Sequence, residues 1–200
     1  MIWAIILAAG ESKRMGQAKL LLPFGKTTII ETVVESVISS KVDKTLVVLG
    51  SRRRQIKERI GRFPVATTYN PRYRRGMLSS VIRGLEALPH SGEAAVVVLA
   101  DLPGVPTSVI DSLIEGFRRE KKGIIVPVYR KKRGHPFLLD LKYKEEIEHL
   151  SPGIGLRELL QRHPEDIFEV GVSTPAVLRD IDNAEDYSRA TKKRKGQAYQ

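Results

Sequence analysis

A loop of small and basic residues follows the first apolar segment and carries groups suited to binding phosphate. Gly10 ends the apolar run, and Ser12, Arg14 and Lys19 follow shortly after it. Small residues let the backbone approach a ligand closely, and Gly10 and Gly16 can adopt a positive φ at which other residues would clash. Exposed loop N–H groups and basic side chains then attract an anion. This pattern predicts a cradle for a nucleoside triphosphate, with contacts from Leu7, Ala8, Ala9, Gly10, Ser12, Arg14 and Lys19.

The cradle matches neither of the two commonest phosphate-binding signatures. A P-loop requires Lys-Ser or Lys-Thr after its second glycine, whereas Gln17 follows Gly16. A dinucleotide fingerprint requires three glycines in G-x-G-x-x-G, whereas Glu11 and Ser12 follow Gly10. The alternative is an ordinary strand-to-helix turn with surface charges. The whole run favours phosphate binding over that alternative.

A carboxylate stands directly after another buried apolar run. Residues 94–100 are apolar, and Asp101 and Pro103 follow them. Ligands of open α/β sheets bind outside the carboxyl ends of the strands, so Asp101 and the cradle are expected to share one edge. A hard carboxylate oxygen there suits Mg²⁺ that bridges phosphates. The alternative role for Asp101 is to cap the turn before Pro103.

A second metal ligand is expected near the end of the chain. Asp180 and Asp182 are both available there, and the residues alone do not rank one above the other. Asp182 also stands where it could cap the last helix. Asp186 falls inside that helix and is expected to face solvent.

Composition narrows the class of protein. The chain has 200 residues, 42% of them hydrophobic, which suits one α/β domain with a sizeable core. No apolar stretch is long enough for a membrane span, no signal peptide is evident, and cysteine is absent. These features predict a cytoplasmic enzyme without disulfides or thiolate chemistry.

The formal charge of +11 raises the question of nucleic-acid binding. Aromatic residues make up only 6% and do not alternate with the basic clusters, as a base-stacking platform would require. Solubility, heat tolerance or an anionic substrate explains the excess equally well. Nucleic acid is therefore not the expected partner. The basic clusters are residues 52–54, 72–75, 118–122, 130–133 and 192–195.

Apolar and amphipathic segments alternate along the chain and predict a mostly parallel sheet with helices on both faces. Strands are expected at 2–7, 45–49, 65–69, 94–99 and 123–128, and helices at 28–39, 55–60, 79–88 and 107–120. Beyond these the pattern predicts strands at 134–139 and 167–170 and helices at 142–148, 155–161 and 184–190. Residues 1–190 are expected to form a single domain, and 191–200 a basic, disordered tail.

Several spaced motifs resemble the nucleotidyltransferase family that includes the molybdenum cofactor nucleotidyltransferases. The resemblance covers about residues 1–190 and implies a three-layer α/β/α, Rossmann-like fold of the nucleotide-diphospho-sugar transferase type. Asn183-Ala184 departs from the usual Thr-Pro of the last motif, which predicts a looser helix start. The matching motifs are Leu7-Ala8-Ala9-Gly10-x-Ser12-x-Arg14-Met15-Gly16-x-x-Lys19, Asn70-Pro71, Gly76-Met77-x-Ser79-Ser80, Leu99-Ala100-Asp101-x-Pro103, Gly134-His135-Pro136 and Asp180-Ile181-Asp182-x-x-Glu185-Asp186.

The resemblance implies transfer of CMP from CTP to the terminal phosphate of molybdopterin, with release of pyrophosphate. Ala9 stands where the guanylyltransferase branch has glycine, which favours CTP. The resemblance further implies Mg²⁺ on Asp101 and Asp182, and delivery of the product to a molybdenum hydroxylase apoenzyme or its chaperone. The alternatives are guanylyl transfer to the same cofactor and nucleotidyl transfer to a sugar or alcohol phosphate.

Each expected site residue has a physical role in such a reaction. Arg14 can form a fork contact with phosphate oxygens, and Lys19 can place a point charge near the breaking bond. Ser79 or Ser80 can bind the cytosine edge, and Asn70 the base or ribose. The acceptor is expected against Gly134, His135 and Pro136, where the alternative is a turn histidine held beside proline.

Overall fold

The computed structural model describes residues 1–12 and 15–197. A mixed sheet forms its centre, with strands in the order β10-β7-β9-β6-β1-β4-β5, and β8 pairs with β7 at the side. β2 and β3 form a separate antiparallel pair. The strands are β1 (Ile2–Ala8), β2 (Pro23–Phe24), β3 (Thr27–Thr28), β4 (Lys44–Leu49), β5 (Ala66–Tyr69), β6 (Ala94–Leu99), β7 (Ile124–Tyr129), β8 (Lys132–Arg133), β9 (Phe137–Asp140) and β10 (Ile167–Gly171).

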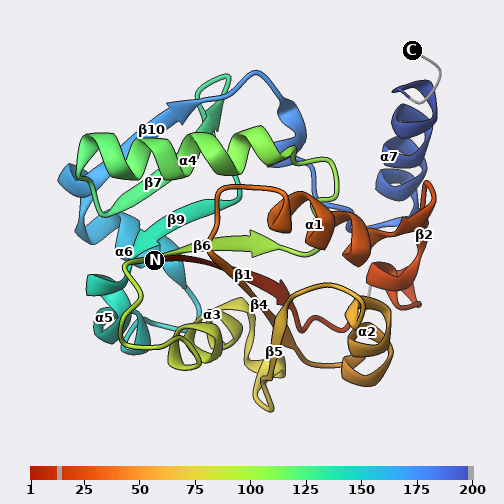
Figure 1. Ribbon diagram of the computed structural model, residues 1–200, viewed down its shortest axis with the longest axis horizontal. Helices are drawn as coiled ribbons and strands as arrows, with labels where there is room; N and C mark the ends of the chain where they lie inside the picture. The colour runs from red at the N-terminus through yellow and green to blue at the C-terminus, as the bar shows by residue number, and fades with distance from the viewer. Residues whose placement is uncertain (13–14, 198–200) are drawn as a thin grey trace.

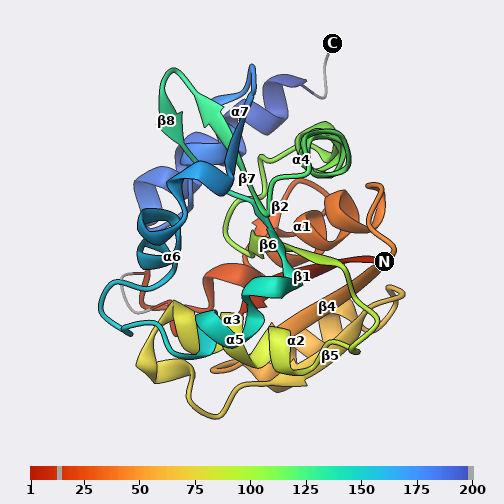
Figure 2. The same ribbon diagram turned by 90° about the vertical axis from the view of Figure 1, so that its left-hand side faces the viewer.

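Helices cover both faces of the sheet and give three layers (Figures 1 and 2). In Figure 2, α1 and α4 lie above and to the right of the diagonal sheet, whereas α3, α5 and α6 lie below it or to its left. None of the helices in the described residues is long and apolar enough to cross a membrane. The α-helices are α1 (Ile29–Ile38), α2 (Arg53–Ile60), α3 (Met77–Glu86), α4 (Thr107–Glu120), α5 (Lys144–Glu148), α6 (Leu156–Arg162) and α7 (Ala184–Gln197).

Successive side chains of β1 point to opposite faces of the sheet, so the core has two halves. Ile2, Ala4 and Ile6 face the cluster that α1, α2 and α4 complete, whereas Ile5 faces the cluster of α3, α5 and α6. Both faces of β1 are thus buried, as expected for a central parallel strand. The predicted mostly parallel sheet between helix layers is confirmed.

β9 departs from the parallel arrangement, as does the short β8, which pairs antiparallel with β7. β9 runs antiparallel to both β6 and β7, and Phe137 near its start pairs with Val97 near the end of β6. The sequence predicts this strand, but from residue 134; the structure begins it at Phe137 because His135 N donates instead to Val177 O at 2.8 Å. The segment before β9 therefore lies beside the carboxyl end of β6.

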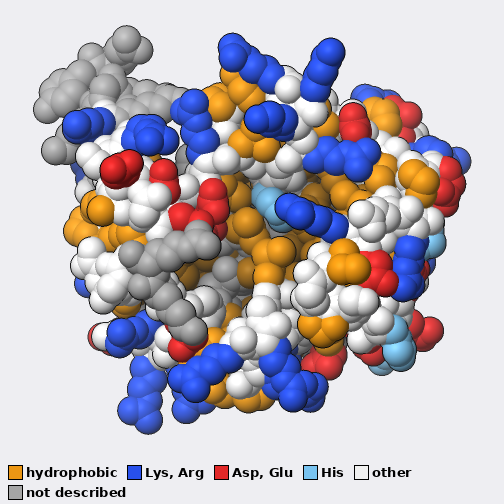
Figure 3. All heavy atoms as spheres, turned by 180° about the vertical axis from the view of Figure 1, so that it is seen from behind, with side chains coloured by type: hydrophobic (Ala, Val, Ile, Leu, Met, Phe, Trp, Pro, Cys, Tyr) orange, Lys and Arg blue, Asp and Glu red, His pale blue; other side chains and the backbone are white. Residues whose placement is uncertain are grey.

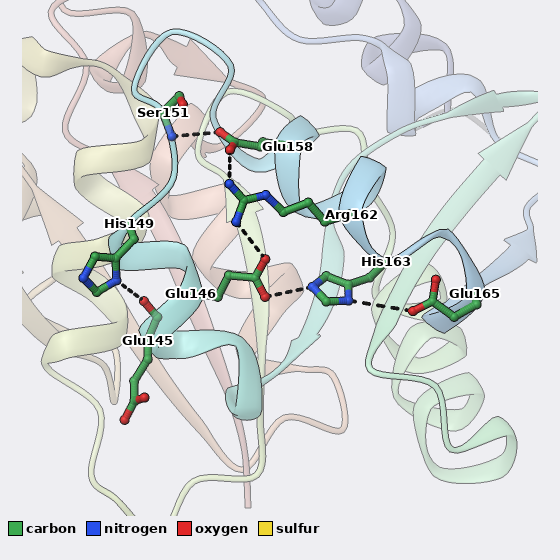
Figure 4. Close-up of polar contacts among 8 residues, drawn as sticks. All are labelled: Glu145, Glu146, His149, Ser151, Glu158, Arg162, His163 and Glu165. Atoms are coloured by element: carbon green, nitrogen blue, oxygen red, sulfur yellow. Dashed lines mark hydrogen bonds and ion pairs between the residues drawn. The ribbon is translucent and has the colours of Figure 1, made fainter.

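Polar contacts hold α5 and α6 together on one side of the sheet (Figure 4). Glu146 accepts from Arg162 at 3.3 Å and lies 2.8 Å from His163 Nε2. Arg162 also pairs with Glu158, which accepts from Ser151 N at 2.8 Å. These contacts fix the loop between the two helices.

The last helix departs from the prediction. α7 continues to Gln197, whereas the apolar pattern ends it at Ala190 and predicts a disordered tail from 191. The sequence after Ala190 has no apolar periodicity, but its lysine and arginine residues have high helix propensity, which the apolar pattern does not register. Residues 198–200 lie outside the described chain.

Candidate functional site

The cradle is a turn at the carboxyl end of β1. Ala8 and Ala9 are buried, and Ser51 N donates to Ala9 O at 3.1 Å. Met15 N donates to Ser12 O at 3.1 Å and closes the turn. Positive φ occurs at Ser12 (54°) and Gly16 (64°), and Gly10 does not use the positive φ that glycine allows. Arg14 lies outside the described residues.

Gly50 at the end of β4 makes the buried position of the cradle possible. A Cβ at Gly50 would lie 2.3 Å from Ala9 O and 2.7 Å from Ala9 Cβ. No side chain fits there, so the glycine allows the cradle to lie directly against the end of β4. Sequence reasoning missed this residue, although it directly follows β4, the strand next to β1, and therefore had to lie at the same edge.

Lys19, Asp101 and Asp182 meet at this edge from three separate parts of the chain. Lys19 Nζ lies 2.8 Å from Asp101 Oδ2 and 3.2 Å from Asp182 Oδ1. Ile181 N donates to Asp101 O at 3.0 Å, which ties the Asp182 segment to the end of β6. Burial alone would lower the pKa of Lys19, but the two carboxylates outweigh it and raise that pKa above its usual value. The lysine is therefore a fixed cation between two acids.

Asp180 completes a cluster of acids that could hold a metal ion. One oxygen each of Asp101, Asp180 and Asp182 lies within 4.8 Å of the others. Burial, followed by Asp182 and Asp101, raises the pKa of Asp180, because each neighbour disfavours another negative charge. Asp180 and Asp182 also line a cavity of about 690 Å³, so a cation can reach the cluster.

The hydrogen bonds at the start of α7 show which nearby residues cap the helix and which remain available as metal ligands. Asp186 N donates to Asn183 Oδ1 at 2.9 Å, so Asn183 caps the helix and Asp182 does not. Asp186 Oδ2 accepts from Asp182 N at 3.2 Å and Asn183 N at 3.3 Å. The expectation that Asp186 faces solvent is wrong, and Asn183 stabilises a helix start that was expected to be loose.

Asn70, Ser79 and Ser80 form one hydrogen-bonded group after β5. Asn70 Nδ2 donates to Ser79 Oγ and Ser80 Oγ, each at 3.0 Å. Asn70 is 2% exposed and Ser80 is 4% exposed. Asn70 N donates to Leu49 O at 2.9 Å, which fixes the group to the end of β4 and thus to the cradle edge.

The segment Gly134-His135-Pro136 approaches the same edge from β9. A Cβ at Gly134 would lie 2.4 Å from Val177 O, so only glycine fits. The His135 ring packs against Phe137 with centroids 4.9 Å apart, and its Nδ1 is buried without a hydrogen-bond partner among the described residues. Burial lowers the pKa of His135 to about 4, although Asp101 opposes the shift. The imidazole is consequently neutral at physiological pH.

The burial of His135 predicts an acid-sensitive fold. Between pH 6.5 and 4 the unfolded chain binds a proton that the folded chain does not, so stability falls as pH falls. The loss approaches roughly 3 kcal/mol. Urea unfolding of wild type and His135→Gln at pH 7.5 and 4 measures it, because the variant should lose less on acidification. The exposed His90→Gln should behave as wild type, and equal pH dependence of His135→Gln and wild type would contradict the prediction.

The space-filling view shows a hollow over this edge (Figure 3). Hydrophobic side chains form its base, acidic side chains lie at one margin, and a histidine and basic side chains lie at another. A site of this kind can hold a polyphosphate at the cradle and a second substrate beside His135. The structure thus brings together the cradle, Asp101, Asp182 and His135, as predicted.

Comparison with known proteins places the chain in a family. Residues 4–167 match the MobA-like NTP transferase domain. Molybdenum cofactor cytidylyltransferase of Escherichia coli (strain K12) is 27% identical over 187 residues, covering 93% of each chain. Nicotine blue oxidoreductase of Paenarthrobacter nicotinovorans is 26% identical over 197 residues, covering 94% of this chain and 95% of that protein.

Solved structures share the fold. The crystal structure of Rv0371c from Mycobacterium tuberculosis H37Rv superposes with a TM-score of 0.86 at 24% identity, covering 96% of this chain and 97% of that one. A second structure of that protein is a complex with manganese, with a TM-score of 0.80 at 22% identity and the same coverage. With the family model matching most of the sequence, the chain belongs to the MobA-like NTP transferase domain family and is a nucleotidyltransferase.

Proposed function

We propose that the protein transfers CMP from CTP to the terminal phosphate of molybdopterin and releases pyrophosphate. The observation that carries this proposal is the meeting of Lys19, Asp101 and Asp182 beside the cradle. A cation-binding pair of acids next to a phosphate loop is what transfer between two anionic phosphates requires. The similarity to the E. coli cytidylyltransferase and the alanine at position 9 support cytidylyl over guanylyl transfer.

The cluster fits a divalent metal, since Asp101 and Asp182 already hold a cation, the Lys19 ammonium. Hard carboxylate oxygens suit Mg²⁺, and the manganese complex of the Mycobacterium protein points to the same metal class. We assign the metal to Asp101 and Asp182, with Asp180 alongside. Bound there, Mg²⁺ supplies neutralisation of charge on phosphate oxygens.

The reaction is an in-line displacement without a covalent enzyme intermediate. An oxygen of the acceptor phosphate forms a bond to the α-phosphorus of CTP, and the bond from that phosphorus to the bridging oxygen of the β-phosphate breaks. Cradle N–H groups from Ala9 to Ser12 and the Arg14 guanidinium hold the phosphates that leave. Lys19 adds positive charge where negative charge builds up. Positioning and charge stabilisation account for the catalysis.

His135 is proposed to face the acceptor. Its buried Nδ1 has no partner among the described residues, and an unpaired buried N–H costs more than an unpaired lone pair. The proton is therefore placed on Nε2, which can donate to the pterin or its phosphate. Gly134 and Pro136 hold this ring at the edge. The product is expected to pass to a molybdenum hydroxylase or its chaperone.

A nucleotide-by-acceptor screen tests the proposed function. Purified protein with Mg²⁺ and molybdopterin should release pyrophosphate at least about tenfold faster with CTP than with GTP, UTP or ATP, a ratio that about 1.4 kcal/mol provides. Pyrophosphate release is the readout because a redox activity, such as the one named for the Paenarthrobacter relative, would produce no pyrophosphate.

Other outcomes of the screen identify the alternatives. Equal or faster release with GTP would contradict cytidylyl transfer, and release only with a sugar or alcohol phosphate would contradict the pterin acceptor. Omitting the acceptor is the control for simple hydrolysis of CTP.

A further inference from the structure

A short hairpin projects from the carboxyl edge of the sheet, directly before the segment proposed to face the acceptor. β7 ends at Tyr129, β8 begins at Lys132, and Val128 pairs with Arg133 across the hairpin. β7 is parallel to β6, since both run antiparallel to β9, so the turn at 130–131 lies beyond the edge that carries the acid cluster. Figure 2 shows β8 standing out from the body of the molecule.

The turn of this hairpin has a backbone conformation that its residue types disfavour. φ is 47° at Arg130 and 65° at Lys131. Two consecutive residues with positive φ form a type I′ turn, which prefers asparagine and glycine because other side chains clash in the left-handed region. An Asn-Gly pair would form the same turn at a lower cost. The basic side chains therefore serve something other than the stability of the turn.

The protein does not neutralise the positive charge at the end of the hairpin. At its base, Arg133 Nε lies 2.7 Å from Glu169 Oε1. Beyond this pair, three exposed cations form what is here called the basic tip: Arg130, Lys131 and Lys132. Within residues 1–12 and 15–197, no carboxylate forms an ion pair with the basic tip. The Arg130 guanidinium lies 5.4 Å from the centre of the Tyr129 ring, which supports the side chain and leaves its charge in place.

We propose that the basic tip is a docking element for a protein with an acidic surface, which it holds beside the acceptor side of the site. Docking itself does not depend on the nucleotide; that the docked protein brings the acceptor or takes the product rests on the proposed function. The basic tip lines neither the cavity of about 690 Å³ nor that of about 540 Å³, and it points outward. Such a position suits a broad partner better than a small anion. Carboxylates spread over a protein surface complement three separate cations.

A nucleic acid fits the basic tip less well than an acidic protein does. Tight binding of duplex DNA neutralises many phosphates along a continuous surface. The same edge carries the cluster of Asp101, Asp180 and Asp182, whose charge repels a phosphate backbone that extends beyond the hairpin. A compact acidic patch, by contrast, needs contact with the three cations alone.

Replacing the turn with its preferred sequence tests the proposal. Arg130→Asn/Lys131→Gly removes two charges and relieves the backbone, so the midpoint of thermal unfolding should rise by about 2–4 °C. The same variant should bind labelled poly-L-glutamate at least about fivefold more weakly than wild type, measured by fluorescence anisotropy in physiological salt. A gain in stability together with a loss of binding excludes misfolding as the cause. If this variant does not fold, Arg130→Gln/Lys131→Gln removes the same charges and should show the same weakening.

Arg118→Gln/Lys121→Gly is the matched control at the amino end of β7. Lys121 follows α4 with a φ of 54°, Arg118 stands in the last turn of that helix, and both are exposed. The control removes the same number of charges and also places glycine at a positive φ. Its affinity for poly-L-glutamate should stay within about twofold of wild type, because salt screens these charges from the basic tip. Equal weakening in both double variants would show that net charge alone accounts for binding and would overturn the proposal.

The remaining outcomes identify other occupants. A wild-type protein that does not bind poly-L-glutamate, or that binds duplex DNA more tightly through the same residues, would overturn the proposal. A rise of about tenfold in KM for free molybdopterin in Arg130→Asn/Lys131→Gly would show that the basic tip binds the acceptor itself, which also overturns it. Binding of poly-L-glutamate that requires the basic tip, in a protein that releases no pyrophosphate with any nucleotide, would leave docking intact while the proposed function fails.

Discussion

Asp101→Asn should reduce kcat by about a thousandfold, the loss expected when a principal charge-stabilising group is removed from a transition state. Asparagine keeps the shape of the side chain and can still accept from Lys19, which now lies 2.8 Å from Asp101. The missing negative charge weakens metal binding and leaves phosphate charge uncompensated. Steady-state pyrophosphate release with CTP, Mg²⁺ and acceptor measures the effect.

The control for Asp101→Asn is Asp111→Asn on α4. Asp111 Oδ1 accepts from Lys41 N at 2.7 Å, a contact that asparagine preserves, and it lies outside the acid cluster. This variant should keep the wild-type kcat. If Asp101→Asn retained kcat within about threefold of wild type, the metal role of Asp101 would be wrong.

Gly50→Ala should displace the cradle and lower affinity for CTP by about a hundredfold, with a loss of stability of about 2 kcal/mol. The added Cβ would lie 2.3 Å from Ala9 O and 2.7 Å from Ala9 Cβ. Neither a backbone oxygen nor the methyl group of an alanine can rotate away from it. The backbone of the cradle must move, and its N–H groups lose their alignment with the phosphates. Calorimetric titration with CTP and urea unfolding measure the two effects.

Gly171→Ala is the matched substitution for Gly50→Ala. A Cβ at Gly171 meets no atom within 4 Å, so the same change should leave CTP affinity unaltered. Wild-type affinity in Gly50→Ala would show that the close approach of Ala9 to Gly50 does not position the phosphate loop.

Most strands and helices were predictable because the spacing of apolar residues within a short stretch of sequence reveals which face is buried. The spans of β6 and α4 agree with the predicted ranges to the residue, since each is an apolar or amphipathic segment with clear ends. The end of α7 was not predictable from the same signal, because the sequence after Ala190 has no apolar periodicity. Helix propensity, which the pattern ignores, decides there.

The site was predictable in its parts but not in its contacts. Asp101 and the cradle follow strands whose ends share an edge, so sequence reasoning could place them together. Lys19 was expected against phosphate, and its contacts to Asp101 and Asp182 join residues 82 and 163 positions apart. Such contacts depend on how distant segments pack. Asn183, by contrast, has the residue type that favours a helix cap and could have been identified from it.

Because β9 runs antiparallel to β6, the residues proposed to bind the nucleotide and those proposed to bind the acceptor come from two different stretches of the chain. Because β9 runs against β6, its first residues lie where β6 ends, and His135 reaches the edge that carries Asp101. Everything proposed to hold the nucleotide, apart from the late acids, precedes residue 102, whereas everything proposed to hold the acceptor follows Pro127. An insertion or exchange between β7 and β9 can therefore change the acceptor while the nucleotide half stays intact. The antiparallel course of β9 thus makes the segment proposed to hold the acceptor a separable module of the fold.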